Sequence, residues 1–190
     1  MMKYEIRRID SFSDKQLDDV YQKLNLEQKI YVDSKPEFKR RQSLAVRALL
    51  AEILRFEILS ELSFDNDGRP LKLFDTDYFS LSHSGEYVAV AVSKHPIGMD
   101  IQCHKEVNKK LIERVFDTNE AEYVKKNGQA GFFELWTLKE AFIKCFYKSF
   151  SEVKKLSFIR EGEIYIPWAD FICKTEQNYT YSIISSEKQR

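Results

Sequence analysis

The stretch YFSLSHSGEYVAVAVSKHPIGMDIQ, residues 78–102, decides the fold class. Residues 78–82 and 87–93 are predicted as two strands, because β-branched and apolar residues run there between turn signals. Ser84 and Gly85 lie in the bend between them. The turn KHP then leads into a further short strand, IGMDIQ. The middle strand is apolar enough to be central in its sheet.

Helical patterns lie on both sides of these strands. Apolar residues recur at helical spacing in residues 38–59, and further helices are expected at residues 111–116, 119–126 and 136–144. The segment FDNDGRP, residues 64–70, is a predicted turn. The tail, residues 156–184, predicts three or four strands around EGE and EQN turns. This order of helices and antiparallel strands predicts an α+β fold.

Length and composition exclude several classes of protein. The chain has 190 residues, which suits one domain or two small lobes sharing a core. It carries 30 Lys and Arg against 30 Asp and Glu, so the basic excess typical of nucleic-acid binding is absent. No apolar run approaches the ~18 residues of a membrane span, and the charged N-terminus is no signal peptide. We therefore expect a cytoplasmic protein with no membrane or nucleic-acid partner.

The cysteines predict reduced thiols, because their number is odd and their spacing does not suit a metal; they are Cys103, Cys145 and Cys173. The segment 95–104 does bring two histidines, His95 and His104, close to Cys103. We disfavour a zinc site there, because such sites usually offer more closely spaced ligand pairs.

The strand GMDIQ carries a candidate cation site. Because side chains alternate along a strand, Gly98, Asp100 and Gln102 share one face, and the glycine is expected to leave room beside Asp100. The opposite, core face carries Ile97, Met99 and Ile101. Oxygen donors on one face suit a hard cation such as Mg²⁺. The alternative is an edge strand with a solvated polar face.

The helix WTLKEAFIK, residues 136–144, carries a second candidate. Trp136, Glu140 and Lys144 lie on one face at i, i+4 and i+8, with Lys139 beside that row. The opposite, apolar stripe contains Leu138, Ala141, Phe142, Cys145 and Phe146. A carboxylate with two ammonium groups can hold a metal-bound phosphate. The alternative is ordinary amphipathicity with a Glu–Lys pair, which leaves the position of Trp136 unexplained.

Two further segments could contact an anion. The turn SHSG, residues 82–85, offers two hydroxyls and an imidazole that can hydrogen-bond phosphate. Near the start of the 38–59 helix stand Lys39, Arg40 and Arg41, where cations oppose the helix dipole. That basic start is either a solvated end or an anion site, and the turn histidine is either a ligand or an exposed residue.

Taken in order, four stretches resemble motifs of the 4'-phosphopantetheinyl transferases of the larger, Sfp-like type. That family carries a G-K-P turn, then F-N-x-S-H-S, G-x-D-x-E and W-x-x-K-E-x-x-x-K. The matching stretches here are GRP (68–70), FSLSHS (79–84), GMDIQ (98–102) and WTLKEAFIK (136–144). Four motifs in matching order are more specific than any one of them. The basic helix start near Arg41 resembles the family's upstream coenzyme A contact region more loosely.

The resemblance implies two similar α/β lobes, residues 1–97 and 98–190, related by pseudo-two-fold symmetry with a coenzyme A cleft between them. It implies Mg²⁺-dependent transfer of the 4'-phosphopantetheine arm of coenzyme A to a serine of an apo acyl, peptidyl or polyketide carrier protein. The by-product would be adenosine 3',5'-bisphosphate. We expect the protein to act as a monomer.

The resemblance also assigns roles to single residues. The magnesium ligands would be Asp100 and Glu140, with Gln102 beside them, and the residues close to the chemistry would be Asp100, Lys139, Glu140 and Lys144. Contacts to coenzyme A would come from Arg41, Arg69, Pro70, Ser82, His83 and Lys144.

The chain departs from the family pattern in two places. Gln102 stands where the family has a second acid, so the site has one negative charge fewer. The segment CFYKSFSE, residues 145–152, has no glycine where the family often shows a G-x-G-L-like stretch. The second departure puts the flexibility of that loop, and the docking of a carrier, in doubt.

Two rival functions remain open. Gln102 alone favours a non-catalytic relative that only binds coenzyme A or a carrier. A small RNA-binding domain would need exposed aromatic residues among basic ones on a sheet, and the net charge of zero disfavours it. Coenzyme A binding without turnover would identify the first rival, and salt-sensitive RNA binding would identify the second.

Overall fold

The computed structural model describes residues 2–54, 78–146 and 148–186. The chain divides into two compact units, Met1–Lys94 and His95–Arg190. This division falls just before strand β4 (Ile97–Cys103), whereas the boundary that we predicted, after residue 97, cuts into that strand. Each unit is described below by itself.

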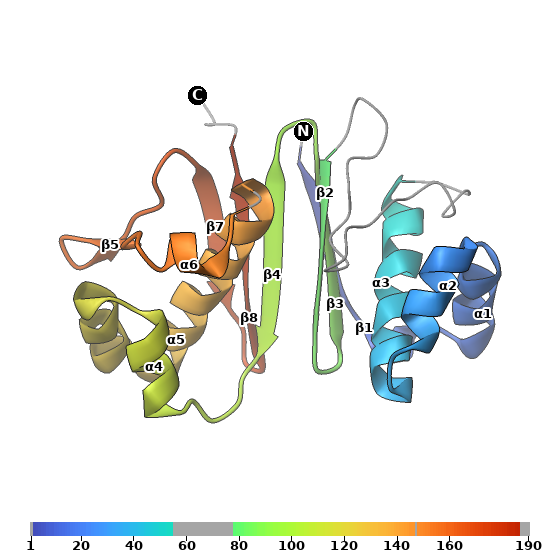
Figure 1. Ribbon diagram of the computed structural model, residues 1–190, viewed down its shortest axis with the longest axis horizontal. Helices are drawn as coiled ribbons and strands as arrows, with labels where there is room; N and C mark the ends of the chain where they lie inside the picture. Colours follow the sequence, from blue (N-terminus) through green and yellow to red (C-terminus); the bar gives the residue numbers. More distant parts are fainter. Residues whose placement is uncertain (1, 55–77, 147, 187–190) are drawn as a thin grey trace. The chain divides into compact units, whose positions relative to one another are not determined.

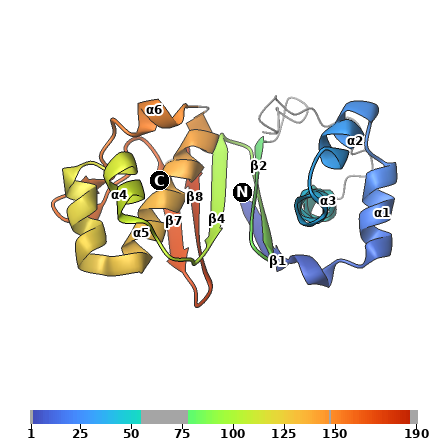
Figure 2. The same ribbon diagram turned by 60° about the horizontal axis from the view of Figure 1, so that its bottom comes forward.

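The first unit is built on a three-stranded antiparallel sheet with the order β1–β3–β2. Helix α3 packs along this sheet, and α1 and α2 pack on α3 (Figures 1 and 2). The elements are β1 (Lys3–Arg8), a 3-10 turn (Ile9–Ser11), α1 (Asp14–Gln22), α2 (Leu26–Asp33), α3 (Glu37–Leu54), β2 (Tyr78–Ser84) and β3 (Tyr87–Ser93).

Local sequence explains where these helices begin. Ser13 and Gln16 form a reciprocal capping box at the start of α1, and Asn25 and Gln28 form another at the start of α2. Within the described residues α3 ends at Leu54, and residues 55–59 of the predicted helix lie outside them. The predicted turn at residues 64–70 also lies outside the described residues.

The hairpin β2–β3 corrects the position of the predicted bend. Ser84 pairs with Tyr87, so it belongs to strand β2, and the two turn residues are Gly85 and Glu86. The positive φ of Gly85, 51°, is the conformation that a tight hairpin turn requires at its first residue. The hairpin therefore presents His83 directly before its turn.

The second unit is also built on a three-stranded antiparallel sheet, with the order β4–β8–β7. Helix α5 packs across it, and α4 packs on α5 (Figure 1). The elements are β4 (Ile97–Cys103), α4 (Lys109–Val115), α5 (Thr118–Phe146), α6 (Phe150–Val153), β5 (Ile159–Arg160), β6 (Glu163–Ile164), β7 (Asp170–Thr175) and β8 (Tyr179–Ser185). The four strands of the tail match the upper limit of our prediction.

Helix α5 has a break at Gly128, where φ is 63° and ψ is −143°. Glycine adopts this conformation without the steric cost that a Cβ atom imposes. The break separates the two predicted helices, residues 119–126 and 136–144. The second segment buries the predicted apolar stripe, with Leu138 and Ala141 fully inaccessible.

The two units share one order of elements. In each, a first strand leads to a long helix and then to two strands, and the last strand pairs with both others: β1–α3–β2–β3 in one unit and β4–α5–β7–β8 in the other. Helices packed on antiparallel sheets confirm the predicted α+β class. No helix in the described ranges is both long and apolar enough to cross a membrane.

Candidate functional site

Asp100 and Lys144 form the centre of the candidate site in the second unit. Asp100 lies on β4 and is only 3% exposed. The Lys144 Nζ, from the last turn of α5, donates to Asp100 Oδ1 at 2.8 Å and to the Met99 carbonyl at 2.9 Å. Strand β4 is an edge strand of its sheet, as the alternative expected, but its polar face is not solvated at Asp100, which is buried and paired.

Gln102 lies beside Asp100, as strand alternation predicts. Its Nε2 donates to Asp100 Oδ2 at 3.3 Å. Rotation of the amide about its last bond would present the oxygen Oε1 at the same place. Gln102 is thus placed to offer an oxygen donor next to the carboxylate.

Gly98 has a different function from the one that we predicted. We expected it to leave room beside Asp100. Instead α5 fills that place: a Cβ atom at residue 98 would lie 1.9 Å from the Ala141 carbonyl oxygen and 2.5 Å from the Cys145 amide nitrogen. Gly98 therefore lets helix and strand approach closely, which brings Lys144 within reach of Asp100.

Glu140 and Trp136 lie on the same half-buried row of α5 as Lys144. The indole of Trp136 stacks on Phe132, with ring centroids 5.9 Å apart, and packs against the core of the second unit. Packing, rather than a ligand, explains why a bulky aromatic residue begins this row. The predicted role of Glu140 as a metal ligand stays a proposal.

Lys139 lies in the core of the second unit, apart from that row. Its side chain is inaccessible, and its Nζ contacts Glu120 Oε1 at 2.9 Å. It also donates to the carbonyl oxygens of Val153 and Leu156, at 3.3 and 3.0 Å. All these partners are protein groups, and no described contact supports the predicted role of Lys139 at a diphosphate.

Glu120 is a residue that our sequence analysis missed. Besides Lys139, it accepts the backbone N–H of Phe158 at 2.9 Å and caps α5 reciprocally with Asp117. This buried cluster joins both halves of α5 to the end of α6 and the segment that follows it. The capping pattern D-x-x-E at residues 117–120 was the signal that could have found it.

In the first unit, the predicted phosphate-binding turn is well ordered by its surroundings. His83 is exposed at the end of β2, whereas Ser82 is buried. Ile9 N donates to the Glu86 carbonyl at 2.8 Å, and Gln42 Nε2 donates to the Gly85 carbonyl at 2.8 Å. His83 is therefore presented from a fixed hairpin.

Carboxylates pair with two of the three cations at the basic start of α3. Arg41 Nη1 contacts Asp14 Oδ1 at 2.5 Å, and its Nη2 donates to the Phe12 carbonyl at 2.9 Å. Arg40 contacts Asp33 at 3.3 Å. Each arginine thus has an acidic partner within its own unit. The two remaining predicted coenzyme A contacts, Arg69 and Pro70, lie outside the described residues.

The structure gives His104 a packing role instead of a zinc-binding one. Its Nε2 lies 2.9 Å from Thr180 Oγ1, and its ring stacks on Phe133. Across residues 2–54, 78–146 and 148–186, no three His, Cys, Asp or Glu side chains gather as a metal site. The predicted magnesium set has only two carboxylates, Asp100 and Glu140, so it would not form such a group.

The donor set around Asp100 nevertheless suits a hard cation. The carboxylate is buried and already holds one cation, the ammonium group of Lys144, at 2.8 Å. The Gln102 amide contacts its other oxygen, Oδ2, at 3.3 Å and can offer an oxygen donor there. Mg²⁺ prefers such oxygen ligands and keeps several waters.

Burial makes two of the thiols poor nucleophiles. It raises the pKa of Cys145 to about 12 and that of Cys173 to about 11. Neither thiol is therefore a candidate for covalent catalysis, which requires a thiolate.

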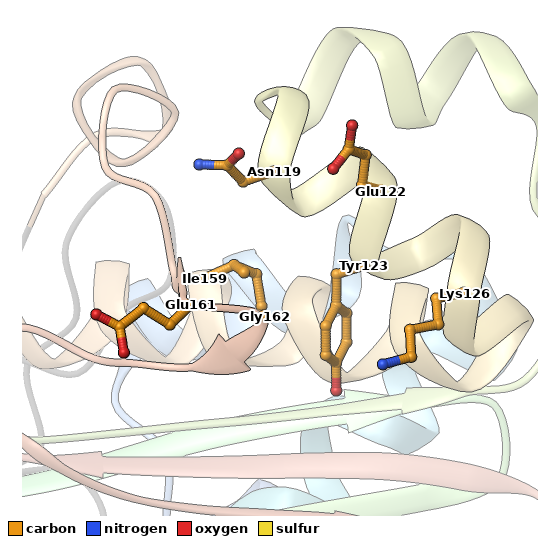
Figure 3. Close-up of a pocket in the computed structure, with 7 residues that line it drawn as sticks. All are labelled: Asn119, Glu122, Tyr123, Lys126, Ile159, Glu161 and Gly162. Atoms are coloured by element: carbon orange, nitrogen blue, oxygen red, sulfur yellow. The ribbon is translucent and has the colours of Figure 1, made fainter.

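A separate groove lies between the first half of α5 and the turn of the β5–β6 hairpin (Figure 3). It is lined by Asn119, Glu122, Tyr123, Lys126, Ile159, Glu161 and Gly162. The Tyr123 hydroxyl in this groove donates to Glu134 at 2.9 Å. None of the predicted site residues lines the groove. The groove therefore forms no part of the Asp100 site.

Comparison with known families assigns the class of this site. Residues 96–185 match the model of the 4'-phosphopantetheinyl transferase superfamily. This part of the chain, which holds both GMDIQ and WTLKEAFIK, is therefore similar to that superfamily. The resemblance that the four motifs predicted is confirmed.

Curated proteins of the same class are similar to this chain. The 4'-phosphopantetheinyl transferase gsp of Aneurinibacillus migulanus is 37% identical over 118 residues, covering 55% of this chain and 49% of the relative. The transferase Sfp of Bacillus subtilis (strain 168) is 29% identical over 116 residues, covering 53% and 51%. A putative transferase of Haemophilus influenzae is 31% identical over 129 residues, covering 60% and 55%. The chain thus spans about half the length of the curated relatives it matches.

Proposed function

We propose that this protein transfers the 4'-phosphopantetheine arm of coenzyme A to a serine of an apo carrier protein. The reaction would depend on Mg²⁺ and release adenosine 3',5'-bisphosphate. The superfamily match and the names of the relatives support the reaction class. The proposed acceptor is an acyl, peptidyl or polyketide carrier protein.

The contact between Asp100 and Lys144 is the observation that carries this proposal. It brings the carboxylate of one family motif within 2.8 Å of the ammonium group of another, across 44 residues of sequence. A diphosphate with its metal needs both kinds of group, an anion for the metal and a cation for the phosphate oxygens. The chain places them side by side in the second unit.

The chemical step needs little covalent participation from the protein. The serine oxygen would form a bond to the β-phosphorus of coenzyme A as the bond to the bridging oxygen breaks, and adenosine 3',5'-bisphosphate would leave with that oxygen. The serine proton would pass to Glu140, directly or through water. Lys144 would neutralise charge that develops on the phosphoryl oxygens, which is the main source of catalysis in such reactions.

Asp100 and Glu140 would hold the Mg²⁺, with Gln102 as a neutral third position. The bound ion would supply positive charge to the diphosphate. Lys139 takes no part in the proposed step, because its ammonium group is engaged with Glu120 in the core. We instead propose that Lys139 maintains the shape of the second unit.

Contacts to coenzyme A from the first unit are part of the same proposal. His83 and Arg41 would contact phosphate groups, Ser82 would support the turn, and Arg69 and Pro70 would lie at the adenine. Binding of coenzyme A between two lobes related by pseudo-two-fold symmetry stays a prediction. So do the cytoplasmic location and the monomeric state.

One incubation tests the proposal. The protein, coenzyme A and Mg²⁺ are mixed with a panel of apo carrier proteins, and intact mass is read for the added phosphopantetheine. A parallel reaction contains excess chelator. Transfer that is unaffected by chelator would contradict the metal assignment, and the absence of transfer to every carrier would contradict the proposed activity.

Two variants of α5 give this experiment a matched control. Glu140→Gln should nearly abolish transfer while the helix persists, because Gln and Glu have similar helix propensities. Glu122→Gln changes an exposed carboxylate in the other half of the same helix and should keep the parent rate. A wild-type rate for Glu140→Gln would remove Glu140 from the proposed reaction.

Gln102 favours one alternative, a non-catalytic relative that binds coenzyme A or a carrier. The same incubation separates the two functions when calorimetry with coenzyme A is added. Binding of coenzyme A without any mass gain on the carriers would support the alternative.

A further inference from the structure

Gln42 on α3 lies directly after Arg41 and is fully buried. Its Nε2 donates to the Gly85 carbonyl at 2.8 Å, at the tip of the β2–β3 hairpin. We propose that Gln42 is a positioning residue, which holds this turn so that His83 meets a phosphate group of coenzyme A. This inference rests on the proposed function, because it requires His83 to bind coenzyme A.

The turn contains only Gly85 and Glu86. Its two carbonyl oxygens accept from Gln42 and from the backbone N–H of Ile9, and the Glu86 carboxylate pairs with Arg8 at 3.1 Å. Gly85 is exposed and has a positive φ of 51°. A hairpin tip of this kind samples other conformations unless its carbonyl groups are held. Gln42 supplies the side-chain contact that holds the first of them.

Stability alone does not explain a glutamine at residue 42. The other amide atom, Oε1, is buried and makes no hydrogen bond within the described part of the chain. A buried acceptor without a partner costs free energy, and such atoms are uncommon in native proteins. An apolar side chain of the same length would fill the space without that cost. The glutamine is therefore explained by what its Nε2 holds.

The same turn of α3 places the second predicted phosphate contact. Arg41 is adjacent to Gln42 and is oriented by Asp14 and the Phe12 carbonyl. Through Gln42, the hairpin carrying His83 is fixed to the helix carrying Arg41. The two predicted phosphate contacts of the first unit thus keep a constant separation.

Calorimetry with coenzyme A on Gln42→Met tests the inference. The Kd for coenzyme A should rise about two- to tenfold, the range expected for one neutral hydrogen bond. The melting temperature should be unchanged or higher, because the orphan Oε1 is removed and water can reach the exposed Gly85 carbonyl. A merely structural residue would show the opposite, a lower melting temperature and an unchanged Kd.

A double-mutant cycle with His83→Ala shows whether Gln42 acts through the histidine. The double variant should bind coenzyme A as weakly as His83→Ala alone, because coupled residues are not additive. Additive losses would overturn the inference. If His83→Ala binds normally, the proposed role of His83 fails, and the inference fails with it. If His83→Ala binds coenzyme A more weakly but Gln42→Met binds it normally, the inference about Gln42 fails while the proposed role of His83 stands.

Gln28→Met is the matched control. Gln28 is also a buried glutamine of the first unit, but it caps α2. Its replacement should lower the melting temperature and leave the Kd for coenzyme A unchanged. Hydrogen exchange gives a second readout: residues 82–88 should exchange faster in Gln42→Met, and unchanged exchange there would overturn the inference. If Gln42→Met does not fold, Gln42→Asn is used instead. Asparagine keeps the amide, but its shorter side chain does not reach the Gly85 carbonyl.

Discussion

At the scale of single residues, two lysines of one motif have different environments. Lys144 is partly exposed, with 22% of its side chain accessible, and pairs with Asp100, whereas Lys139 is inaccessible and pairs with Glu120. From the sequence, we recognised both lysines as part of the motif WTLKEAFIK and assigned both to a diphosphate. Charged residues are rarely buried, and the partner of Lys139 lies 19 residues away, so no local pattern indicated its burial.

Lys139→Met should destabilise the protein by about 3–5 kcal/mol, the cost typical of leaving one charge of a buried pair without its partner. Denaturant unfolding measures this change. Adding Glu120→Gln to the same chain should recover part of the loss, because the uncompensated carboxylate is then neutral. If Lys139→Met keeps its stability and instead loses affinity for coenzyme A, Lys139 belongs at the diphosphate after all.

Gln102→Glu should lower the Mg²⁺ concentration needed for half-maximal rate, because a charged oxygen attracts the ion more than a neutral one. Initial rates are measured against Mg²⁺ for the parent, Gln102→Glu and Gln102→Ala. Gln102→Ala should raise the magnesium requirement less than Asp100→Ala does, since water replaces a neutral oxygen donor more readily than an anionic one. An equal or higher magnesium requirement for Gln102→Glu would place residue 102 away from the metal.

At the scale of elements, the packing of α5 on β4 determines the site. The sequence predicted the strand, the helix and the buried apolar stripe of the helix, because periodicity reports which face of a helix is buried. It could not give the distance between the two elements. That distance depends on Gly98, whose missing Cβ lets the backbone of α5 come close.

Gly98→Ala should destabilise the protein by about 1–3 kcal/mol or more, because overpacking forces backbone shifts and here the clash is with backbone atoms. It should also lower the transfer rate, since Asp100 is two residues away on the same strand. Unfolding and initial rates measure the two effects. Gly162→Ala is the control: a Cβ there has nothing within 4 Å, so only its positive φ should be felt and the rate should not change. A normal transfer rate in Gly98→Ala would show that activity does not depend on the close packing of α5 on β4.

A short capped helix occupies part of the segment that lacks the family's glycines. Glu152 of α6 accepts from Ser149 N and Oγ, both at 2.9 Å, and pairs with Lys148 at 3.2 Å. This S-x-x-E capping box was visible in the sequence, yet we read only the missing glycines there. Helix α6 therefore gives part of this segment regular structure, and the docking of a carrier there stays a prediction.

The hydrogen bonds from Ser149 and the pair with Lys148 lower the pKa of Glu152 from 4.5 to about 2. A carboxyl group with a lowered folded-state pKa contributes stability above its unfolded value, and the contribution is lost as pH falls from about 4.5 to about 2. An NMR titration of the carboxyl carbon measures the pKa. Ser149→Ala should move it back toward 4.5, whereas an ordinary value in the parent would mean that the capping box is not formed in solution.

At the scale of the whole molecule, both units repeat the order strand, helix, strand, strand. We detected no repeat in the sequence, because the shared feature is the connection of elements rather than residue identity. The predicted contacts to coenzyme A are also divided, with Arg41 and His83 in the first unit and Lys144 in the second. Function on this proposal therefore requires both units of the chain.

Coenzyme A with Mg²⁺ should consequently slow amide exchange in both units at once. We expect protection at the β2–β3 turn, which carries His83, and at β4 and the last turns of α5, which carry Asp100 and Lys144. Hydrogen exchange of the parent with and without coenzyme A measures it. In Lys144→Met, the affinity for coenzyme A and the protection of amides in the second unit should fall together, because one cation facing the diphosphate is lost. Protection confined to one unit in the parent would mean that coenzyme A binds that unit alone, and the division of its contacts between the units would be wrong.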